Sequence, residues 1–315
     1  MSFSLSFRPP VRLLVDLVLL GLLLVLVENF GRFWGLPTKR GFFCDDESLM
    51  YPYHENTVSP TLLHWLGLYL PLIGLIILES FLCYRGDRSH WKFLWPVYNT
   101  VRWFLYGYVF NDLIKSIGKH TIGRLRPHFF AVCMPHFQDG GSCSDAAYQG
   151  VKKYFTDYDC RPDLSGATED MIRDVNVSFP SGHSAMSFYG LVFVALHLRH
   201  RRWPLPGSLL SPVLQLACVA LAWFVALSRV MDYKHHWSDV AAGSLLGAGT
   251  AFAVVQAAVL EERQRRCQEA QSLVQGQPSV NAKQEAAVAA AEGAAAKGGQ
   301  QLAHDLCLVS CQSSN

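Results

Sequence analysis

Charged side chains are scarce in this sequence: they make up 17% of its 315 residues, against about a quarter in an ordinary soluble domain. The formal net charge is only +2, so the chain lacks the broad basic surface of a protein that binds DNA or RNA. Half of the residues are apolar and the mean hydropathy is +0.16, which excludes a disordered or collagen-like chain. The composition points to a membrane protein.

Apolar residues gather in six segments, each close to the roughly 20 residues that a helix needs to cross the hydrocarbon core of a bilayer. The segments are 11–30, 60–82, 95–118, 182–198, 208–228 and 237–260. The first resembles a signal peptide, but it is long, lacks a clear small-residue cleavage site and is followed by more spans. We therefore expect an all-α bundle of six transmembrane helices, with a sizeable exoplasmic loop between the third and the fourth.

Basic residues set the orientation of this bundle. Six spans place both termini on the same side of the membrane. Three connections on that side carry basic clusters, namely Arg85, Arg88 and Lys92; Arg199, Arg201 and Arg202; and Arg263, Arg265 and Arg266. By the positive-inside rule this side is the cytosol. We expect a multi-pass protein of the plasma membrane with both termini in the cytosol; an internal membrane would suit the same topology.

The cysteines suit this orientation. Four of the nine lie in connections on the outer side, where an oxidising environment permits disulfides: Cys44, Cys133, Cys143 and Cys160. Four cysteines allow three full pairings, and the sequence does not choose among them. Asn176 begins an N-glycosylation sequon on the same side, which predicts a glycoprotein, although the sequon lies very close to the fourth span.

The composition changes beyond about residue 262. Residues 268–315 are rich in alanine, glutamine, glycine and serine and poor in large apolar residues. Such a segment cannot bury enough surface to offset the loss of conformational entropy on folding. We expect a membrane domain over residues 1–262 and a cytosolic, low-complexity, disordered tail over residues 263–315.

Three polar clusters fall at the outer ends of the expected helices, and this shared depth is the main argument for a single site. The first runs from Lys119 to Arg126 and Pro127. The two cations are seven residues apart and would share a face if the third helix continued through them, but Pro127 favours a helix end here. Two cations beside a membrane suit a multiply charged anion; snorkelling of interfacial side chains is the simpler alternative.

The second cluster, Phe179-Pro-Ser-Gly-His-Ser184, opens the fourth helix. Ser181 suits an N-cap, and the free backbone N–H groups of a helix start bind phosphate well. Gly182 would let a phosphate come close to the backbone. His183 would then stand beside the bound phosphate. The alternative is a capped helix with an interfacial histidine.

The third cluster runs from Ser228 to Asp239. His235 and Asp239 are four residues apart, so on a helix they would meet on one face. A carboxylate that holds one ring nitrogen fixes the tautomer and leaves the other nitrogen free to attack. Arg229 adds a planar fork of donors suited to phosphate oxygens. The alternative is an ordinary helical pair with a neutral histidine.

A metal site is a further alternative for this cluster. Its ligands would be His235, His236, Asp239 and His183. Lys119, Arg126 and Arg229 would repel a metal ion if they converged there. We therefore expect neither a metal nor a cofactor.

The motifs Lys-x6-Arg-Pro, Pro-Ser-Gly-His and Ser-Arg-x5-His-x3-Asp occur in this order and at matching depth. With all three, the chain resembles the phospholipid phosphatase family, also called lipid phosphate phosphatases or type 2 phosphatidate phosphatases. The segments from Arg40 to Tyr53 and from Gly123 to Phe129 resemble the animal branch in particular. The resemblance covers about residues 8–260, and no signature position departs from it.

The resemblance implies a role for each motif residue. His235 would be the nucleophile that forms a phosphohistidine, Asp239 would orient it, and His183 would protonate the leaving oxygen of the lipid alcohol. The phosphate oxygens would be bound by Lys119, Arg126, Ser181, Gly182 and Arg229.

The family works without a metal on lipids held in the bilayer: phosphatidate, lysophosphatidate, sphingosine 1-phosphate and ceramide 1-phosphate. Two alternatives stay open, a non-enzymatic protein that binds or transports lipid phosphates and a sugar-phosphate phosphatase of the same superfamily. The intact His183, His235 and Asp239 favour an enzyme, because binding alone needs neither a nucleophile nor a general acid. The oligomeric state is also open, a homo-oligomer included.

Overall fold

The computed structural model describes residues 9–84, 90–148, 150–201 and 208–276. The chain divides into two units, residues 1–255 and 256–315. The basic connection at 85–89, the residues 202–207 and the tail beyond 276 lie outside the described residues. The expectations for Arg85, Arg88, Arg202 and a disordered tail after residue 276 therefore stay predictions.

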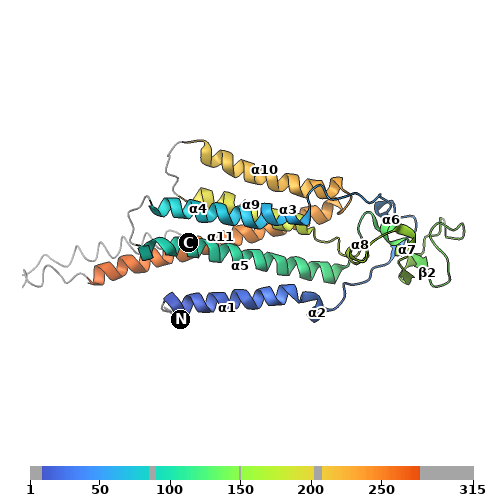
Figure 1. Ribbon diagram of the computed structural model, residues 1–315, viewed down its shortest axis with the longest axis horizontal. Coiled ribbons are helices and arrows are strands. Elements are labelled where there is room, and N and C mark those ends of the chain that lie inside the picture. Colours follow the sequence, from blue (N-terminus) through green and yellow to red (C-terminus); the bar gives the residue numbers. More distant parts are fainter. Residues whose placement is uncertain (1–8, 85–89, 149, 202–207, 277–315) are drawn as a thin grey trace, which may run out of the picture. The chain divides into compact units, whose positions relative to one another are not determined.

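Six long helical stretches coincide with the six apolar segments of the sequence (Figure 1). The first is α1 (Pro9–Glu28), which a short helix α2 (Phe30–Trp34) follows. The second consists of α3 (Pro60–His64), a π-helical turn η2 (Trp65–Tyr69) and α4 (Leu70–Tyr84). The others are α5 (His90–Ile122), α9 (Gly182–His200), α10 (Leu210–Met231) and α11 (Trp237–Gly276).

The last helix is longer than expected. α11 continues to Gly276, so residues 263–276 are helical where the composition predicted the start of a disordered tail. Glu262 forms ion pairs with Arg265 at 3.1 Å and with Arg266 at 2.9 Å. Pairs at these spacings stabilise a helix, and the composition argument did not weigh them.

Three of these stretches are long and apolar enough to cross a membrane, among the residues that the structure describes: Pro60–Tyr84, Leu210–Met231 and Trp237–Gln268. Large apolar side chains also point away from the protein on α1 and α10; Leu14 and Leu216 are 62% and 70% exposed. Water would disfavour so much exposed apolar surface, whereas lipid accepts it. The chain thus has the helices of a multi-pass membrane protein.

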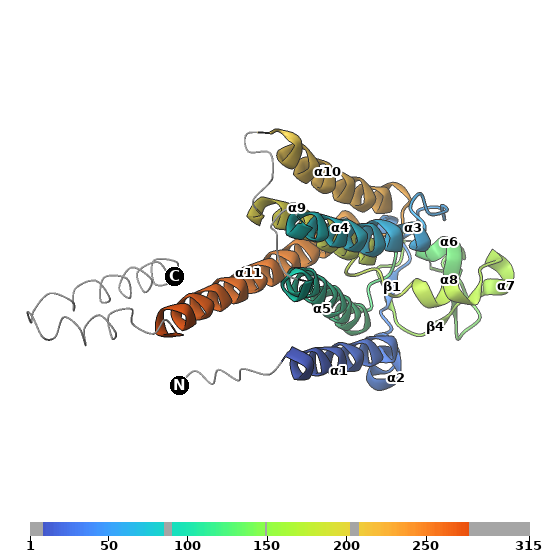
Figure 2. The ribbon, with the colours of Figure 1, turned by 60° about the vertical axis from the view of Figure 1, so that its left-hand side comes forward.

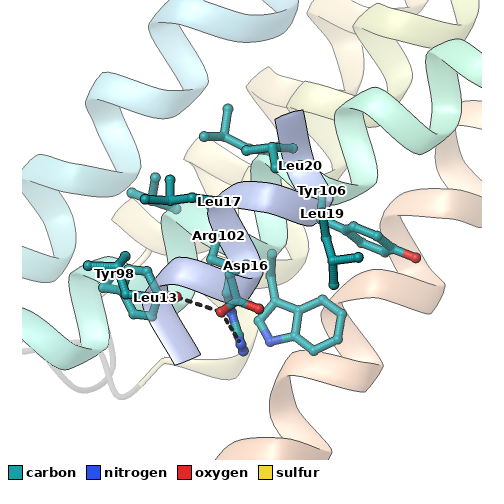
Figure 3. Close-up of a pocket in the computed structure, with 11 residues that line it drawn as sticks. Leu13, Asp16, Leu17, Leu19, Leu20, Tyr98, Arg102 and Tyr106 are labelled. Atoms are coloured by element: carbon teal, nitrogen blue, oxygen red, sulfur yellow. Dashed lines mark hydrogen bonds and ion pairs between the residues drawn. The ribbon is translucent and has the colours of Figure 1, made fainter. Parts of the chain in front are cut away.

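α9 is the central helix of the first unit and packs against α5, α10 and η2. The crossing with η2 is close, because a Cβ atom at Gly190 would collide with the carbonyl oxygen of Gly67. At one edge of this unit α1 packs along α5, and α10 lies at the other edge (Figure 2). Asp16 of α1 and Arg102 of α5 form an ion pair of 3.0 Å between these two helices (Figure 3).

The connections 35–59 and 123–181 fold together into a small lobe, which we call the disulfide lobe. It contains η1 (Glu47–Leu49), α6 (Phe129–Cys133), α7 (Pro162–Ser165) and α8 (Glu169–Asp174). Strand β1 (Phe42–Phe43) pairs antiparallel with β3 (Tyr154–Phe155), and β2 (His136–Phe137) pairs antiparallel with β4 (Tyr158–Asp159). These strands correct the all-α expectation, since two residues are too few for an alternating pattern to be recognised.

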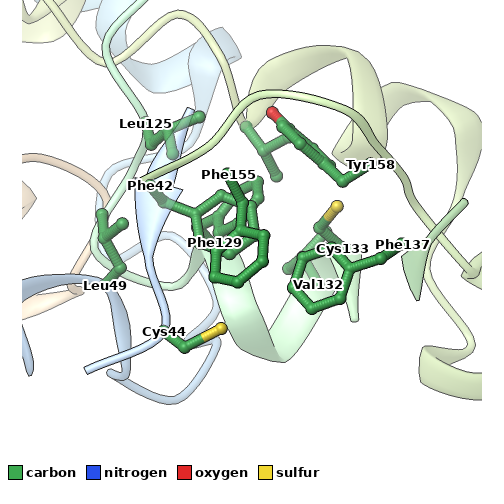
Figure 4. Close-up of a cluster of buried hydrophobic side chains, with 11 residues drawn as sticks. Phe42, Cys44, Leu49, Leu125, Phe129, Val132, Cys133, Phe137, Phe155 and Tyr158 are labelled. Carbon is green, nitrogen blue, oxygen red and sulfur yellow. The ribbon is translucent and has the colours of Figure 1, made fainter. Parts of the chain in front are cut away.

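Aromatic side chains form the core of the disulfide lobe. Phe42 packs against Phe129 and Tyr158 with ring centroids 5.1 and 5.0 Å away (Figure 4). Two disulfides close the lobe, Cys44–Cys143 and Cys133–Cys160. They settle the pairing that the sequence left open, and the first joins the two connections, whose cysteines are 99 residues apart.

Candidate active site

The three sequence motifs come together where α5 and α10 end, where α9 and α11 begin, and where the disulfide lobe meets them. His235 lies in the short turn between α10 and α11 and is 3% exposed. Its Nδ1 atom lies 2.7 Å from the carbonyl oxygen of Ser178. A carbonyl oxygen only accepts hydrogen bonds, so Nδ1 carries the proton and Nε2 of the neutral ring keeps its lone pair. Nε2 is therefore the ring nitrogen that could attack an electrophile.

Positive charge gathers around this imidazole. Burial lowers the pKa of His235 well below its usual value, and the nearby charges of Arg126, Lys119 and Arg229 lower this pKa further. A lowered pKa keeps the ring neutral, which a nucleophile requires. Lys119, Arg126 and Arg229 therefore lie close enough to His235 to act on its charge; that they bind a phosphate there stays a prediction.

Asp239 is completely buried at the start of α11, but its hydrogen bonds differ from the expected ones. Its carboxylate accepts from the Ser178 hydroxyl at 2.6 Å, from Arg124 at 2.6 Å and from the His236 backbone N–H at 3.1 Å, and Nδ1 of the His236 ring lies 3.2 Å from it. α11 begins only at Trp237, so His235 precedes the helix and the expected helical pairing of His235 with Asp239 does not form. Ser178 links the two instead, since its hydroxyl also lies 3.4 Å from Nδ1 of His235.

The start of α9 is a serine-capped helix N-terminus beside the third motif. The Ser181 hydroxyl caps the helix by accepting from the Ser184 N–H at 3.4 Å, and the first N–H groups of any helix have no partner within it. The Ser181 N–H donates to the Asp239 carbonyl oxygen at 3.0 Å. Gly243 permits this approach, because a Cβ atom there would collide with the Ser181 carbonyl oxygen. The second and third motifs are thus tied together at their helix starts.

His183 lies in the first turn of α9. Its Nε2 atom lies 3.1 Å from the Val58 carbonyl oxygen, so the disulfide lobe orients this second imidazole. The same carbonyl accepts from Arg229 at 3.4 Å. The Val58 carbonyl oxygen is therefore a hydrogen-bond partner shared by His183 and Arg229. The sequence motifs alone do not reveal this contact.

Arg229 is almost fully buried at the end of α10. One terminal nitrogen donates to Asn56 at 2.8 Å, and the other lies 3.4 Å from Asp232. Its Nε atom is buried without a hydrogen-bond partner among the described residues. A buried guanidinium donor without a partner is costly, and a phosphate oxygen would satisfy it.

The other two predicted cations approach from the third helix. Lys119 lies in the last turn of α5, which ends at Ile122, so Lys119 and Arg126 do not share a helical face. Arg126 stands in the following loop and is 6% exposed. It donates from Nε to the Asp174 carbonyl oxygen at 2.8 Å and pairs with the Asp174 carboxylate at 3.1 Å.

Five residues that the motifs did not single out help to build this site: Asn56, Arg124, Ser178, Asp232 and Lys234. Asp232 accepts from the Thr57 hydroxyl at 2.6 Å and so holds the lobe against the end of α10. Lys234 is buried, and its ammonium lies 3.4 Å from the ring centroid of Tyr53. Burial, with Arg126 and Arg229 nearby, lowers the pKa of Lys234 to about 8. In the sequence, the only feature that could have indicated a role for Lys234 is its position directly before His235.

Comparison of the sequence with known proteins shows which family the chain belongs to. The sequence profile of the PAP2 superfamily matches residues 100–263, which hold all three motifs. A "Putative phosphatidate phosphatase" of Drosophila melanogaster is 39% identical over 70% of this chain, which spans 61% of that relative's length. "Phospholipid phosphatase 1" of Mus musculus is 38% identical over a stretch that covers 69% of this chain and 74% of the mouse protein.

"Phospholipid phosphatase 2" of Homo sapiens is 36% identical over a stretch that covers 67% of this chain and 70% of the human protein. No solved structure matches the chain. The family resemblance inferred from the three motifs is confirmed. The chain belongs to the PAP2 superfamily, as a membrane-embedded phosphatase.

Proposed function

We propose that the protein removes the phosphate group from lipid phosphates at the exoplasmic face of a membrane, without Mg²⁺. The substrates would be phosphatidate, lysophosphatidate, sphingosine 1-phosphate and ceramide 1-phosphate. The names of the relatives support a phospholipid or phosphatidate as substrate. The observation that carries the mechanism is the His235 ring, whose Nδ1 is held by the Ser178 carbonyl while cations surround it.

In the first step Nε2 of His235 attacks phosphorus, and the bond from phosphorus to the lipid oxygen breaks. His183, which would be an imidazolium beside the bound phosphate, gives its second ring proton to that oxygen, so a neutral lipid alcohol leaves and a phosphohistidine remains. In the second step water attacks this phosphorus while His183 takes a proton from the water. The bond from Nε2 of His235 to phosphorus breaks and inorganic phosphate leaves, so His235 is again neutral and His183 is again an imidazolium. Dividing the displacement in this way replaces one difficult step by two easier ones.

Charge stabilisation would come from the chain itself. Lys119, Arg126 and Arg229, together with the Ser181 hydroxyl and the backbone N–H of Gly182, would bind the phosphate oxygens. Phosphoryl transfer depends mainly on positioning and on stabilising negative charge. Three cations and a helix start supply both, and they would also repel a metal ion.

The experiment measures phosphate release from lysophosphatidate and from glucose 6-phosphate in the presence of EDTA. The wild type should act on the lipid, whereas His235→Ala and His183→Ala at equal expression should not. Near-normal activity of His235→Ala would refute the phosphohistidine mechanism. Release only from glucose 6-phosphate would favour a sugar-phosphate phosphatase, no release from either would favour a binding or transport protein, and loss of activity in EDTA would indicate a metal.

For the topology we propose six spans with both termini in the cytosol and the disulfide lobe outside, in the plasma membrane. Two disulfides in one lobe support an oxidising side for that lobe. The test uses intact cells and a membrane-impermeant thiol reagent applied after an impermeant reductant. Labelling of Cys44 and Cys143 from outside is expected. Labelling that requires permeabilised cells would place the lobe in the cytosol or in an internal compartment.

A further inference from the structure

A cavity of about 390 Å³ lies between α1 and α5 (Figure 3). Its wall is mostly apolar and includes Leu13, Leu17 and Leu20 from α1 and Val101, Leu105 and Tyr106 from α5. None of these residues belongs to the phosphatase site. Ligand sites with mostly apolar walls and a few placed polar groups are the usual form of small-molecule pockets.

The polar groups of this cavity form one compact cluster. Asp16 accepts hydrogen bonds from the Tyr98 hydroxyl at 2.5 Å and from Arg102 at 3.0 Å. Arg102 also donates to the Asn99 side chain at 2.7 Å. The pair of Asp16 and Arg102 carries no net charge by itself, although it offers both acceptors and donors. Asp16 keeps 23% of its side chain exposed and can accept a further hydrogen bond.

The cluster lies far from the catalytic end of the same helix. Arg102 precedes Lys119 by 17 positions on α5, which at 1.5 Å per residue is about 25 Å. The hydrocarbon core of a bilayer is about 30 Å thick. With Lys119 at one boundary of the core, Asp16 and Arg102 lie close to the other boundary, where the polar end of a lipid resides.

These features select the chemistry of a ligand. A phosphate headgroup would meet the negative charge of Asp16, whereas a neutral hydroxyl can donate to Asp16 and accept from Arg102. The lining of α1 runs from Leu13 to Leu20, about 10 Å along the helix axis. A rigid fused ring system fits this short apolar wall better than two flexible acyl chains, which would lose more conformational entropy on binding.

An independent sequence observation points the same way. Leu94, Tyr98 and Arg102 match the spacing Leu-x3-Tyr-x3-Arg, a pattern proposed for contact with cholesterol. The pattern alone is weak, because short combinations of these residues are common in membrane helices. In this chain its tyrosine and arginine both line the cavity.

We propose that this cavity binds a membrane sterol, with the sterol hydroxyl on Asp16 and Arg102 and the rings against Leu17, Leu20 and Tyr106. The ligand class is a neutral lipid with one hydroxyl group and a rigid apolar body. Diacylglycerol is the other neutral hydroxylated lipid that the chemistry could admit, so the experiment separates the two.

The experiment uses the full chain in phosphatidylcholine nanodiscs and a diazirine-bearing cholesterol analogue. After irradiation, mass spectrometry should locate the label on peptides that contain residues 13–20 and 98–106. Unlabelled cholesterol should compete with the probe. The 3α epimer of cholesterol and dioleoylglycerol should compete far less, because the first misplaces the hydroxyl and the second lacks the rigid rings. Equal competition by dioleoylglycerol, or label confined to other helices, would overturn the proposal.

A matched pair of variants adds a second readout. Leu20→Trp fills the cavity, whereas Leu22→Trp places the same side chain on α1 at a residue that is 62% exposed and does not line the cavity. Leu20→Trp should lower labelling at least about five-fold, a change of about 1 kcal/mol in binding, and Leu22→Trp should not. Equal labelling of both variants, with unchanged gel-filtration profiles, would count against the site. The competition experiment with the epimer uses only the wild type, so it decides the question even if Leu20→Trp fails to fold.

Discussion

Ser178 holds His235 through its backbone and reaches Asp239 through its side chain. Its carbonyl oxygen lies 2.7 Å from Nδ1 of His235, and its hydroxyl donates to the Asp239 carboxylate at 2.6 Å. The proposed nucleophile and the buried carboxylate are therefore connected through one serine. If His235 is the nucleophile as proposed, Ser178 is a positioning residue for it and not a catalytic one.

Replacing Ser178 by alanine should lower kcat while leaving KM nearly unchanged. The backbone carbonyl remains in Ser178→Ala, but the hydroxyl bond to the charged Asp239 is lost. A hydrogen bond to a charged group contributes about 1.5–3 kcal/mol, so kcat should fall about ten- to hundred-fold. Ser187→Ala is the control, since Ser187 is buried in α9 and bonds only to the Ser184 carbonyl among the described residues. Steady-state kinetics on a lipid phosphate measures both constants, and an unchanged kcat for Ser178→Ala would contradict this role.

Arg124 and Arg126 are neighbours in sequence but should differ in function. Arg124 donates to the Asp239 carboxylate and to the Ser238 hydroxyl at 2.6 and 2.7 Å, whereas Arg126 is among the cations near His235. Lysine keeps the charge but not the planar fork of donors. Arg124→Lys should therefore lower mainly kcat, and Arg126→Lys should also raise KM.

Kinetics with a lipid phosphate and with inorganic phosphate as inhibitor would separate these two roles. Arg173→Lys, at a side chain that is 74% exposed, should change neither constant. Phosphate should inhibit Arg124→Lys as well as it inhibits the wild type and should inhibit Arg126→Lys more weakly. Identical behaviour of the two lysine variants would show that both arginines serve the same function.

The sequence indicated which candidate residues lie near one another, but it did not indicate the hydrogen-bond partners that hold them. His183, Lys119 and Arg229 could be recognised because their motifs combine charge, glycine and helix-start chemistry at the same depth. Ser178 and Arg124 could not, because their roles depend on the path of the loops before α9 and after α5. The periodic patterns that predict helices and strands do not predict the path of a loop. The expected pairing of His235 with Asp239 assumed a helix through both, and α11 begins two residues too late for it.

The fold shows the same difference between local patterns, which the sequence reveals, and contacts between distant segments, which it does not. Long apolar segments predict helices well, since burial in lipid demands internally hydrogen-bonded backbone. The disulfide lobe has strands of two residues that depend on contacts between distant segments, such as Phe42 with Phe155. Such pairing leaves no local signal in the sequence.

The pH dependence of the reaction should reflect the environment of His235. Burial and the nearby cations lower the pKa of this imidazole below its ordinary value of about 6.5. The ring is neutral and nucleophilic above its pKa, so the acid limb of kcat/KM that it causes should lie below pH 6.5. A 31P NMR titration of the substrate supplies the correction for the second ionisation of its own phosphate. A corrected acid limb at or above pH 6.5 would show that the free enzyme does not hold His235 in this state.

Glu79 should be essential for the stability of the bundle at the end away from the active site. This residue of α4 is 2% exposed and accepts hydrogen bonds from His197 at 2.6 Å and from Arg201 at 2.7 Å. Removing one partner of a buried charged cluster leaves the other without compensation, at a cost of about 3–5 kcal/mol. Glu79→Ala should therefore lower the free energy of unfolding by this order. Glu79→Gln should cost less, because its amide oxygen still accepts one hydrogen bond.

Thermal unfolding in detergent, followed by tryptophan fluorescence, measures these changes. Glu28→Ala is the matched control, since Glu28 ends α1 at an exposed position and should change the midpoint little. Phosphatase activity of Glu79→Gln, assayed below its unfolding temperature, should stay close to that of the wild type because Glu79 lies outside the catalytic cluster. A midpoint for Glu79→Ala equal to that of Glu28→Ala would show that His197 and Arg201 find other partners once the carboxylate is gone.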